Sequence, residues 1–372
     1  MANILHYEIS SASGDLSQTL QNVKNSKIQK SFKNIMVNSQ DIEIPYYGFK
    51  QPVEQNQSSI KDALREVVSK IVAKIDTNKR ARTSLIIGTA LIDCNLMEMV
   101  KKVSYVDEKP PYSSKKTSID TYAKELALEF GLNDFTMTIN TACTSSVNAL
   151  LEASNLIKCG VVDYAIVVGL EIFSPIMSSG FYTMSLLSDK DIKPFDKTRD
   201  GIVLGEGIGV ILLGEDESKW SLLGGFSNCN SETITSVSQS GDECVEVMQN
   251  ALQNTSLHVE DITAVKAHGT GSDSNDLAEI NAMSKVFDSS LIFTALKPYV
   301  GHTIGASGAL EIALFMSCID NGFLPKTLTC KESILDDYTP LKEHTECSDG
   351  IFMCNYFGFG GNNTSLIIKR DI

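Results

Sequence analysis

Cys143 lies where a predicted strand gives way to a predicted helix. A β-branched run over residues 136–141 is typical of a strand, and apolar residues recur at helical spacing over 147–156. The first turn of a helix offers unpaired backbone N–H groups and the positive end of the helix dipole, so the pKa of a thiol there should be lowered. Cys143 is therefore a candidate nucleophile. The alternative is that it only packs in a core, as free cysteines often do.

Two of the five histidines lie in similar surroundings. His268 follows an apolar segment in AHGTG (267–271), and His302 lies in VGHTIGASG (300–308). Glycine beside such a side chain lets the backbone approach a ligand closely. A single buried histidine is more often structural than catalytic, but two imidazoles and a thiol at strand ends are hard to explain by packing alone, and they predict nucleophilic catalysis. The histidines interpreted as surface or packing residues are His6, His258 and His344.

The composition excludes several other classes of function. The chain of 372 residues, 42% hydrophobic and 21% charged, has an ordinary globular composition and room for roughly two or three domain-sized units. Its formal net charge of −14 argues against general binding to nucleic acids and to anionic membrane surfaces. No apolar segment approaches the roughly 20 residues that span a bilayer, so no membrane association is expected.

The nine cysteines favour a reduced compartment. Their number is odd, no C-x-x-C occurs, and none pairs with histidine at metal-ligand spacing, so no metal site is predicted. The N-terminus has no basic segment followed by an apolar run, as a signal peptide would. We therefore expect a cytoplasmic protein.

Strands and helices alternate along most of the chain, which favours βαβ units and buried, largely parallel sheets. Residues 1–58 show little beyond a short apolar start, and 170–204 are predicted as mostly connection. Strand 221–226 is expected to pair with strand 207–213. The predicted strands cover about 84–90, 136–141, 163–169, 207–213, 221–226, 262–267, 291–294, 352–356 and 364–369. The predicted helices cover about 59–75, 119–130, 147–159, 243–252, 276–287 and 308–319.

Two segments with the same residue pattern suggest that the chain consists of two similar halves. Residues 205–216 and 358–371 are each a glycine cluster followed by an apolar strand and a charged stop. We therefore predict an N-terminal half, 1–216, with Cys143, and a C-terminal half, 217–372, with His268 and His302.

Several motifs in one order resemble a known family. The chain from about residue 59 onward resembles the β-ketoacyl-[acyl-carrier-protein] synthases, the elongating condensing enzymes (ketosynthases) of the thiolase-like superfamily. The motifs are TAC (141–143), DKTRDG (196–201), AHGTG (267–271), Lys297, GHTIGASG (301–308), Glu311 and FGFGG (357–361). The resemblance implies an α/β fold in which two similar βαβ-type halves stack as α-β-α-β-α layers. The short N-terminal region departs from the family, since it lacks the usual glycine-rich opening strand.

The resemblance also assigns the reaction, which extends a fatty-acid, polyketide or aryl polyene chain by two carbons. Cys143 would attack an acyl thioester, and the N–H groups of Cys143 and Phe359 would form the oxyanion hole. His268 and His302 would bind the thioester carbonyl of a malonyl-acyl carrier protein and stabilise the enolate left by loss of carbon dioxide. That carbanion would then attack the acyl group on Cys143 in a decarboxylative Claisen condensation.

Other positions receive supporting roles from the resemblance. Lys297 and Glu311 match a buried pair expected to orient His302, although a lysine after a strand is otherwise most often a surface residue. Thr270 and Ser272 match positions that bind the phosphopantetheine arm, although turn chemistry explains them equally well. The predicted gate loop, which alone would be interpreted as a hairpin turn, comprises Phe357, Gly358, Phe359, Gly360 and Gly361 within the segment up to Asn363.

The implied partners are an acyl carrier protein and a second ketosynthase subunit, in a homodimer or a heterodimer. No cofactor is implied, because the substrates are carried on the phosphopantetheine of the acyl carrier protein. Basic residues that would steer the acidic carrier, or would simply be solvated surface charges, are Lys109, Lys115, Lys116, Lys197 and Arg199.

Three alternatives follow from the same resemblance. A chain-length-determining subunit with limited activity of its own usually lacks the cysteine, whereas this chain keeps Cys143 with both histidines. A thiolase would have a second cysteine in the C-terminal loop, and 357–363 contains none. A synthase that starts chains from acyl-CoA typically has asparagine at the position of His302.

Overall fold

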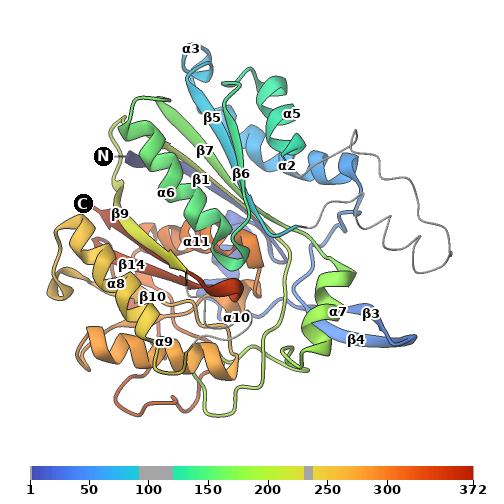
Figure 1. Ribbon diagram of the computed structural model, residues 1–372, viewed down its shortest axis with the longest axis vertical. Coiled ribbons are helices and arrows are strands. Elements are labelled where there is room, and N and C mark those ends of the chain that lie inside the picture. Colours follow the sequence, from blue (N-terminus) through green and yellow to red (C-terminus); the bar gives the residue numbers. More distant parts are fainter. Residues whose placement is uncertain (1, 92–119, 230–237, 372) are drawn as a thin grey trace.

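The computed structural model describes residues 2–91, 120–229 and 238–371 (Figure 1). Within them, eleven strands form one mixed sheet, in which the short β2 (Gly14–Asp15) pairs only with β1. Two smaller two-stranded sheets lie apart: the hairpin β3 (Ser31–Val37) with β4 (Gln40–Tyr46), and β12 (Phe323–Leu324) with β13 (Thr345–Glu346). None of the described helices is both long and apolar enough to cross a bilayer.

The large sheet consists of two half-sheets with one pairing pattern. In each, two antiparallel pairings are followed by two parallel ones. The first runs in the order β1 (Ala2–Ser11), β8 (Gly207–Gly214), β7 (Tyr164–Glu171), β5 (Thr83–Thr89), β6 (Thr136–Ile139). The second runs β9 (Trp220–Cys229), β15 (Asn362–Arg370), β14 (Gly350–Phe357), β10 (Ala264–Lys266), β11 (Phe293–Thr294). They join where residues 2–4 of β1 pair with 220–222 of β9.

This pattern explains the similarity between residues 205–216 and 358–371 of the sequence. The two glycine-led segments form β8 and β15, which hold the same place in their half-sheets and pair antiparallel with the strands on both sides. The α/β fold with two stacked halves is therefore confirmed. The division of the chain near residue 216 stays a prediction.

Helices cover both half-sheets and fill the space between them (Figure 1). The middle layer is α6 (Ser145–Lys158) and α11 (Ser307–Asp320). Outside the first half-sheet lie α2 (Gln57–Val72) and α5 (Thr121–Phe130), and outside the second lie α8 (Asp242–Thr255) and α9 (Asp273–Val286). Because α11 is surrounded on all sides, every residue from Ser307 to Ile319 is buried, which is why its sequence is apolar all round.

The two central helices approach each other closely at their N-terminal ends. A Cβ at Gly308 of α11 would lie 2.4 Å from the backbone nitrogen of Val147 in α6, so only glycine fits there. This contact places the turns that precede the two helices side by side. Those turns are η1 (Ala142–Thr144) and η3 (Ile304–Ala306).

One expectation about the order of the strands was wrong, and two segments contain more regular structure than was expected. Residues 2–11 form the central strand β1, so the chain does have an opening strand, although without the usual glycines; a bulge between Ile4 and His6 breaks the apolar alternation that would have revealed it. Strand β9 does not pair with β8, because β1 lies between them. The segment 170–204 is mostly connection, as predicted, but it also contains the helix α7 (Pro175–Thr183).

The remaining short elements are mostly connections. They are α1 (Leu16–Lys24), α3 (Thr77–Arg80), α10 (Lys297–Val300), η2 (Val259–Asp261) and η4 (Phe359–Gly361).

Candidate active site

Cys143 lies in the η1 turn, directly before α6, and is 1% exposed. The turn is held by Ser145, whose Oγ accepts a hydrogen bond from the Thr141 N–H at 3.0 Å and donates one to the Ala142 carbonyl at 2.6 Å. Ala142 has a φ of +53°, a left-handed conformation that costs energy in a residue with a Cβ. This strained turn presents the sulfur at the end of the helix rather than along its side.

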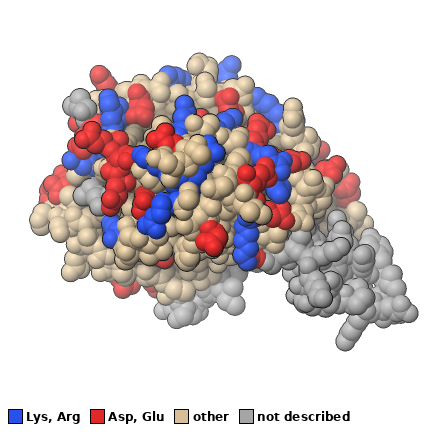
Figure 2. All heavy atoms as spheres, turned by 90° about the horizontal axis from the view of Figure 1, so that it is seen from above, with Lys and Arg blue, Asp and Glu red and all other residues tan. Residues whose placement is uncertain are grey.

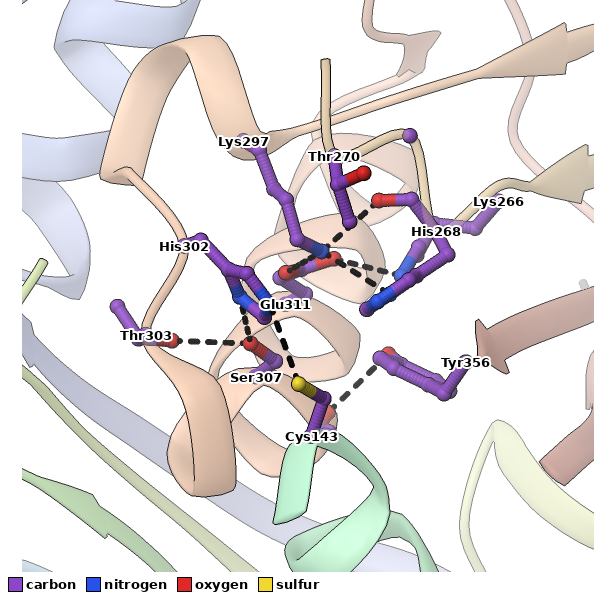
Figure 3. A network of polar contacts seen from close by, with 12 residues as sticks. Cys143, Lys266, His268, Thr270, Lys297, His302, Thr303, Ser307, Glu311 and Tyr356 are labelled. Carbon is purple, nitrogen blue, oxygen red and sulfur yellow. Dashed lines mark hydrogen bonds and ion pairs between the residues drawn. The ribbon is translucent and has the colours of Figure 1, made fainter. Parts of the chain in front are cut away.

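His302 reaches the sulfur from the equivalent turn of the second half. Its Nε2 lies 3.2 Å from Cys143 Sγ (Figure 3). Its Nδ1 accepts a hydrogen bond from the Ile304 N–H at 3.3 Å, and Ser307 Oγ lies at the same distance. Because Nδ1 acts as an acceptor for a backbone N–H, we assign the imidazole proton to Nε2, which points toward the sulfur.

His268 completes the group from the loop after β10. Its ring meets that of His302 edge to face, with centroids 5.4 Å apart. Its Nδ1 lies 3.2 Å from the ammonium of Lys297, which again assigns the proton to Nε2. That Nε2 is buried and has no hydrogen-bond partner among the described residues. The sulfur and one nitrogen of each imidazole lie within 4.8 Å of one another, so the structure brings the three predicted residues together.

Lys297 and Glu311 form the expected buried pair but hold the other histidine. Lys297 Nζ donates to Glu311 Oε1 at 2.7 Å and to the His268 carbonyl at 2.8 Å. Both side chains are fully buried. The expectation that this pair orients His302 was wrong. Lys297 lies in α10, which follows β11. From there its ammonium reaches the loop after β10, which carries His268.

Sequence reasoning missed Lys266, a second buried ammonium on the same carboxylate. Its Nζ donates to Glu311 Oε2 at 2.6 Å and lies 3.8 Å from the centroid of the Tyr356 ring. The signal was present, since a lysine stands in the otherwise apolar strand 262–267.

Sequence reasoning also missed two buried carboxylates that hold the His268 loop. Glu279 accepts hydrogen bonds from the N–H groups of His268 (2.7 Å) and Gly269 (2.8 Å). Asp276 accepts from the N–H groups of Thr270 (2.8 Å) and Gly271 (3.1 Å). Burial raises the pKa of Asp276 to about 6 and that of Glu279 to about 7. The available signal was their three-residue spacing on one face of a predicted helix.

A pocket opens onto the Cys-His-His group. Its wall includes the predicted gate loop, which contains the η4 turn, and the predicted pantetheine positions Thr270 and Ser272. The hydroxyls of Thr270 and Ser272 lie 2.9 Å apart, and Thr270 Oγ1 also donates to Asp276 Oδ1 at 3.1 Å. Asn275, which sequence reasoning passed over, lines the same pocket, and its buried Nδ2 has no partner among the described residues.

Models of two protein families match most of the chain. "Beta-ketoacyl synthase, N-terminal domain" matches residues 27–219, and "Beta-ketoacyl synthase, C-terminal domain" matches residues 221–331. The chain belongs to the beta-ketoacyl synthase family.

Its relatives include enzymes from bacteria and plants. The chain is 28% identical over 323 residues to 3-oxoacyl-[acyl-carrier-protein] synthase 2 of Vibrio cholerae, covering 80% of this chain and 78% of the relative. It is 32% identical over 258 residues to the chloroplastic 3-oxoacyl-[acyl-carrier-protein] synthase I of Arabidopsis thaliana, covering 64% of this chain but only 54% of the relative.

Solved ketosynthase structures share the whole fold. The ketosynthase ApeO of Xenorhabdus doucetiae, in complex with its chain length factor ApeC, is matched with a TM-score of 0.86 and 23% identity, covering 100% of this chain and 98% of that one. A beta-ketoacyl synthase from Burkholderia phymatum is matched with a TM-score of 0.85 and 22% identity, covering 100% and 99%. At these identities the likeness shows the fold alone.

The candidate nucleophile, Cys143, differs electrostatically from the expectation. Burial raises the pKa of Cys143 to about 11, which outweighs the lowering by the Phe359 N–H and the Lys297 ammonium. The expectation of a lowered pKa for this thiol was therefore wrong: the gate loop that brings the Phe359 N–H to the sulfur also excludes water from it. The ring of Phe359 packs against Phe181, with centroids 5.5 Å apart, and so closes the pocket on that side.

The two imidazoles are held in the neutral form. Burial lowers the pKa of both His268 and His302 well below the usual value, and the positive charge of Lys297 lowers it further. Neutral rings with the proton on Nε2 are donors toward the space beside the sulfur. This protonation state is the one that the binding of a carbonyl or enolate oxygen requires.

The predicted docking residues divide into three groups. Lys109, Lys115 and Lys116 lie outside the described residues. Arg199 donates to the carbonyls of Asp196, Ser272 and Asp273, and its side chain is 9% exposed. Lys197 is exposed and paired with Asp336 at 2.9 Å.

Some of the surface charges elsewhere are also paired. Figure 2 shows basic and acidic side chains mixed over the face above the first half-sheet. There Lys61 and Arg65 of α2 form ion pairs with Glu125 and Glu129 of α5.

Proposed function

We propose that this chain catalyses the decarboxylative Claisen condensation of an acyl group on Cys143 with a malonyl group on an acyl carrier protein. The observation that carries the proposal is the convergence of one thiol and two neutral, Nε2-protonated imidazoles on one buried point. The product is a β-ketoacyl thioester two carbons longer than the starting acyl chain.

In the first half-reaction, Cys143 Sγ attacks the carbonyl carbon of an acyl-carrier thioester. The N–H groups of Cys143 and Phe359 both lie toward the sulfur, where they lower the pKa of the thiol, and they would stabilise the oxyanion of the tetrahedral intermediate. The intermediate collapses to acyl-Cys143, and the carrier leaves with its thiol protonated by the proton that Cys143 loses.

In the second half-reaction, the thioester carbonyl of the malonyl carrier accepts hydrogen bonds from the Nε2–H groups of His268 and His302. The carbon–carbon bond to the carboxylate breaks, carbon dioxide leaves, and its electron pair forms an enolate whose oxygen the two imidazoles stabilise. The enolate carbon attacks the acyl-Cys143 carbonyl, forms the new carbon–carbon bond and expels the Cys143 thiolate. Every charge that develops meets a protein donor, so we propose that the reaction needs no metal ion or further cofactor.

The pocket is the proposed path of the carrier's phosphopantetheine arm. Ser272 and Asn275 line it, and the unpartnered Asn275 Nδ2 is a donor for an amide carbonyl of that arm. Thr270 shares its hydroxyl with Ser272 and Asp276, so it would bind the arm together with Ser272. A reduced thiol nucleophile and a carrier-bound substrate favour the cytoplasm as the site of action.

A second candidate is that the chain works as one subunit of a ketosynthase heterodimer, with limited activity of its own. Two structural neighbours are described as a ketosynthase with its chain length factor. In this chain, β6 ends the large sheet, and among the described residues no strand covers its outer edge. An uncovered edge strand favours pairing with a second subunit, either a copy of this chain or a related one.

The test is to incubate the purified chain with acyl-carrier and malonyl-carrier, alone and with a second ketosynthase subunit from the same source. Mass spectrometry then measures the acyl group on Cys143 and the β-ketoacyl product on the carrier. Condensation by the chain alone supports the first candidate, and condensation only with the partner supports the second. Condensation by the chain alone that is unchanged by Cys143→Ala substitution would refute the first candidate. Condensation by the pair that is unchanged by this substitution would mean that the partner carries out the chemistry. No condensation, either alone or with the partner, would refute both candidates.

A further inference from the structure

Lys266 is a buried ammonium that the proposed mechanism does not use. It is the last residue of β10, two positions before His268, and is fully buried. Its Nζ reaches Glu311 Oε2 at 2.6 Å and the Asn355 carbonyl at 3.5 Å, and it lies over the Tyr356 ring. A charge this deep is costly unless it is paired, so its place beside the site calls for an explanation.

Glu311 is shared between two ammonium groups (Figure 3). One carboxylate balances one ammonium, so the trio of Lys266, Glu311 and Lys297 has a net positive charge when both lysines are protonated. Burial lowers the pKa of Lys266, and the Glu311 carboxylate opposes that shift. Without Lys266, the remaining pair would be neutral, and Glu311 would attract the Lys297 ammonium without competition.

This trio of charged side chains lies directly behind the imidazole of His268, which lines the pocket. Lys297 bridges it to His268, because one ammonium contacts Glu311 Oε1, His268 Nδ1 and the His268 carbonyl. The positive charges of Lys297 and Lys266 both lower the pKa of His268 and of His302, in addition to the effect of burial.

Other titratable groups also face the two imidazoles. Glu279 is bound to the backbone of His268 rather than its ring, and the Tyr356 ring centroid lies 6.0 Å from that of His268. Glu171 accepts the N–H of Gly305, three residues after His302. The full set is Cys143 of η1, Glu171 of β7, Lys266 of β10, Glu279 of α9, Lys297 of α10, Glu311 of α11 and Tyr356 of β14, together with the other histidine.

We propose that Lys266 is a positioning residue for the malonyl half-reaction: acting through Glu311 and Lys297, it keeps both imidazoles neutral and their Nε2–H groups available to the oxygen that becomes an enolate. The inference rests on the proposed function. It separates the two half-reactions, because the oxyanion donors for acyl transfer to Cys143 are backbone N–H groups, which do not depend on this charge.

The test compares three variants of the full chain: Lys266→Met, which removes the charge, Lys266→Arg, which keeps it, and the double variant Lys266→Met/Glu311→Gln, which leaves the single ammonium of Lys297. The malonyl half-reaction is measured as carbon dioxide released from a malonyl-carrier between pH 5 and 9. Acyl loading is measured by mass spectrometry of Cys143 with an acyl-carrier, and thermal unfolding reports on folding.

The expected result is a loss in Lys266→Met that is confined to one half-reaction. Decarboxylation should fall by up to about tenfold on the acid side of the pH profile and change little at neutral pH, where the imidazoles stay neutral. Its acid limb should move up by about one pH unit, because the imidazoles protonate more easily. Acyl loading should stay within about twofold of the wild type. Lys266→Arg and the double variant, which restore the net charge, should return the acid limb to its wild-type position.

Two results would overturn the inference. One is an unmoved acid limb in Lys266→Met, whether activity is unchanged or falls equally in both half-reactions, since that marks a structural role. The other is an acid limb that stays shifted in Lys266→Met/Glu311→Gln, the double variant that restores the net charge. This second result also decides the question if Lys266→Met fails to fold. Wild-type protein that neither loads Cys143 nor decarboxylates malonyl-carrier, even with its partner subunit, would instead refute the proposed function itself.

Discussion

The first half-sheet and the second each place a short turn and a central helix after equivalent strands. Cys143 follows β6 and precedes α6 in the first half, and His302 follows β11 and precedes α11 in the second. The two turns meet where α6 and α11 approach each other, so the pseudo-symmetry itself brings sulfur and imidazole to 3.2 Å. The fold thus brings the two side chains together, and each half contributes its own reactive group.

The surroundings of the two turns differ sharply. Around Cys143, hydroxyl groups dominate: Thr144 Oγ1 donates to the Thr141 carbonyl, and Ser145 closes the turn. Around His268 and His302, the buried groups are charged, with Lys266, Lys297, Glu279 and Glu311 all fully buried. The hydroxyl groups of the first half hold the turn that presents the sulfur, while the second half fixes which imidazole nitrogen carries the proton. The predictions below test this division of labour.

The largest effect is expected from Cys143→Ala, which removes the chemistry of the first half alone. Condensation should fall by about four orders of magnitude or more, because in the proposed mechanism this residue holds the acyl chain covalently. Release of carbon dioxide from malonyl-carrier should continue, since His268 and His302 remain in place. Measurement of both products in one reaction checks the prediction. Loss of decarboxylation together with condensation would show that the halves do not act separately.

The converse substitution, His268→Ala, removes a donor from the second half. Decarboxylation should fall by about 10²–10³-fold, the usual cost of one oxyanion donor. Acyl loading of Cys143 should persist, because His268 contacts neither the sulfur nor the backbone N–H groups around it. His258→Ala, at an exposed histidine, is the matched control and should change neither reaction. Equal loss of loading and decarboxylation would contradict the assignment of His268 to the malonyl half-reaction.

The reactive side chains were predictable from sequence because each stands out locally. Cys143, His268 and His302 follow apolar strands and are flanked by small residues, a pattern readable within a few positions. Most central strands and helices were predictable for a similar reason, since a buried run of apolar residues is a local signal. Strand β1 was not, because its bulge breaks the alternation and its burial depends on β8 and β9, which are distant in sequence.

The electrostatics of the site were not predictable from sequence. Whether Lys266 is a surface or a buried charge depends on Glu311, which reaches it from another helix. The pKa of Cys143 depends on the balance between a helix start, visible in the sequence, and burial under the gate loop at Phe359, which is not. The histidine that Lys297 contacts was also not predictable, because nothing in the local sequence distinguishes His268 from His302.

A smaller effect is expected from Glu171→Gln, which tests a carboxyl that links the halves. Glu171 ends β7 in the first half, and its Oε2 accepts the N–H of Gly305 in the second at 3.0 Å, while Oε1 has no partner among the described residues. Burial raises the pKa of Glu171 to about 8. The unfolded chain therefore loses this proton near pH 4.5, and the folded chain keeps it until about pH 8, so this group makes stability fall as pH rises between those values.

Glu171→Gln should remove that contribution while keeping the hydrogen bond to Gly305. The free energy of unfolding of the variant should exceed that of the wild type at pH 9 by about 4–5 kcal/mol, from 3.5 pKa units at about 1.4 kcal/mol each, and match it more closely at pH 4.5. Urea unfolding at both pH values measures the difference. A variant with the same pH dependence as the wild type would show that Glu171 is ionised throughout.

The smallest effect is expected at the surface, from Lys197→Ala. Lys197 is 46% exposed and paired with Asp336, so its loss should leave the midpoint of thermal unfolding almost unchanged. If this lysine steers an acidic carrier, the KM for acyl-carrier should rise about two- to fivefold at low salt and return toward the wild-type value at high salt. The KM for a small acyl-pantetheine thioester should not change. Lys285, 45% exposed and paired with Asp242 of α8, provides the matched control. Because both lysines carry the same charge in the same kind of ion pair, equal carrier KM values for Lys197→Ala and Lys285→Ala would mean that Lys197 is an ordinary solvated charge, and carrier docking would then depend on other residues.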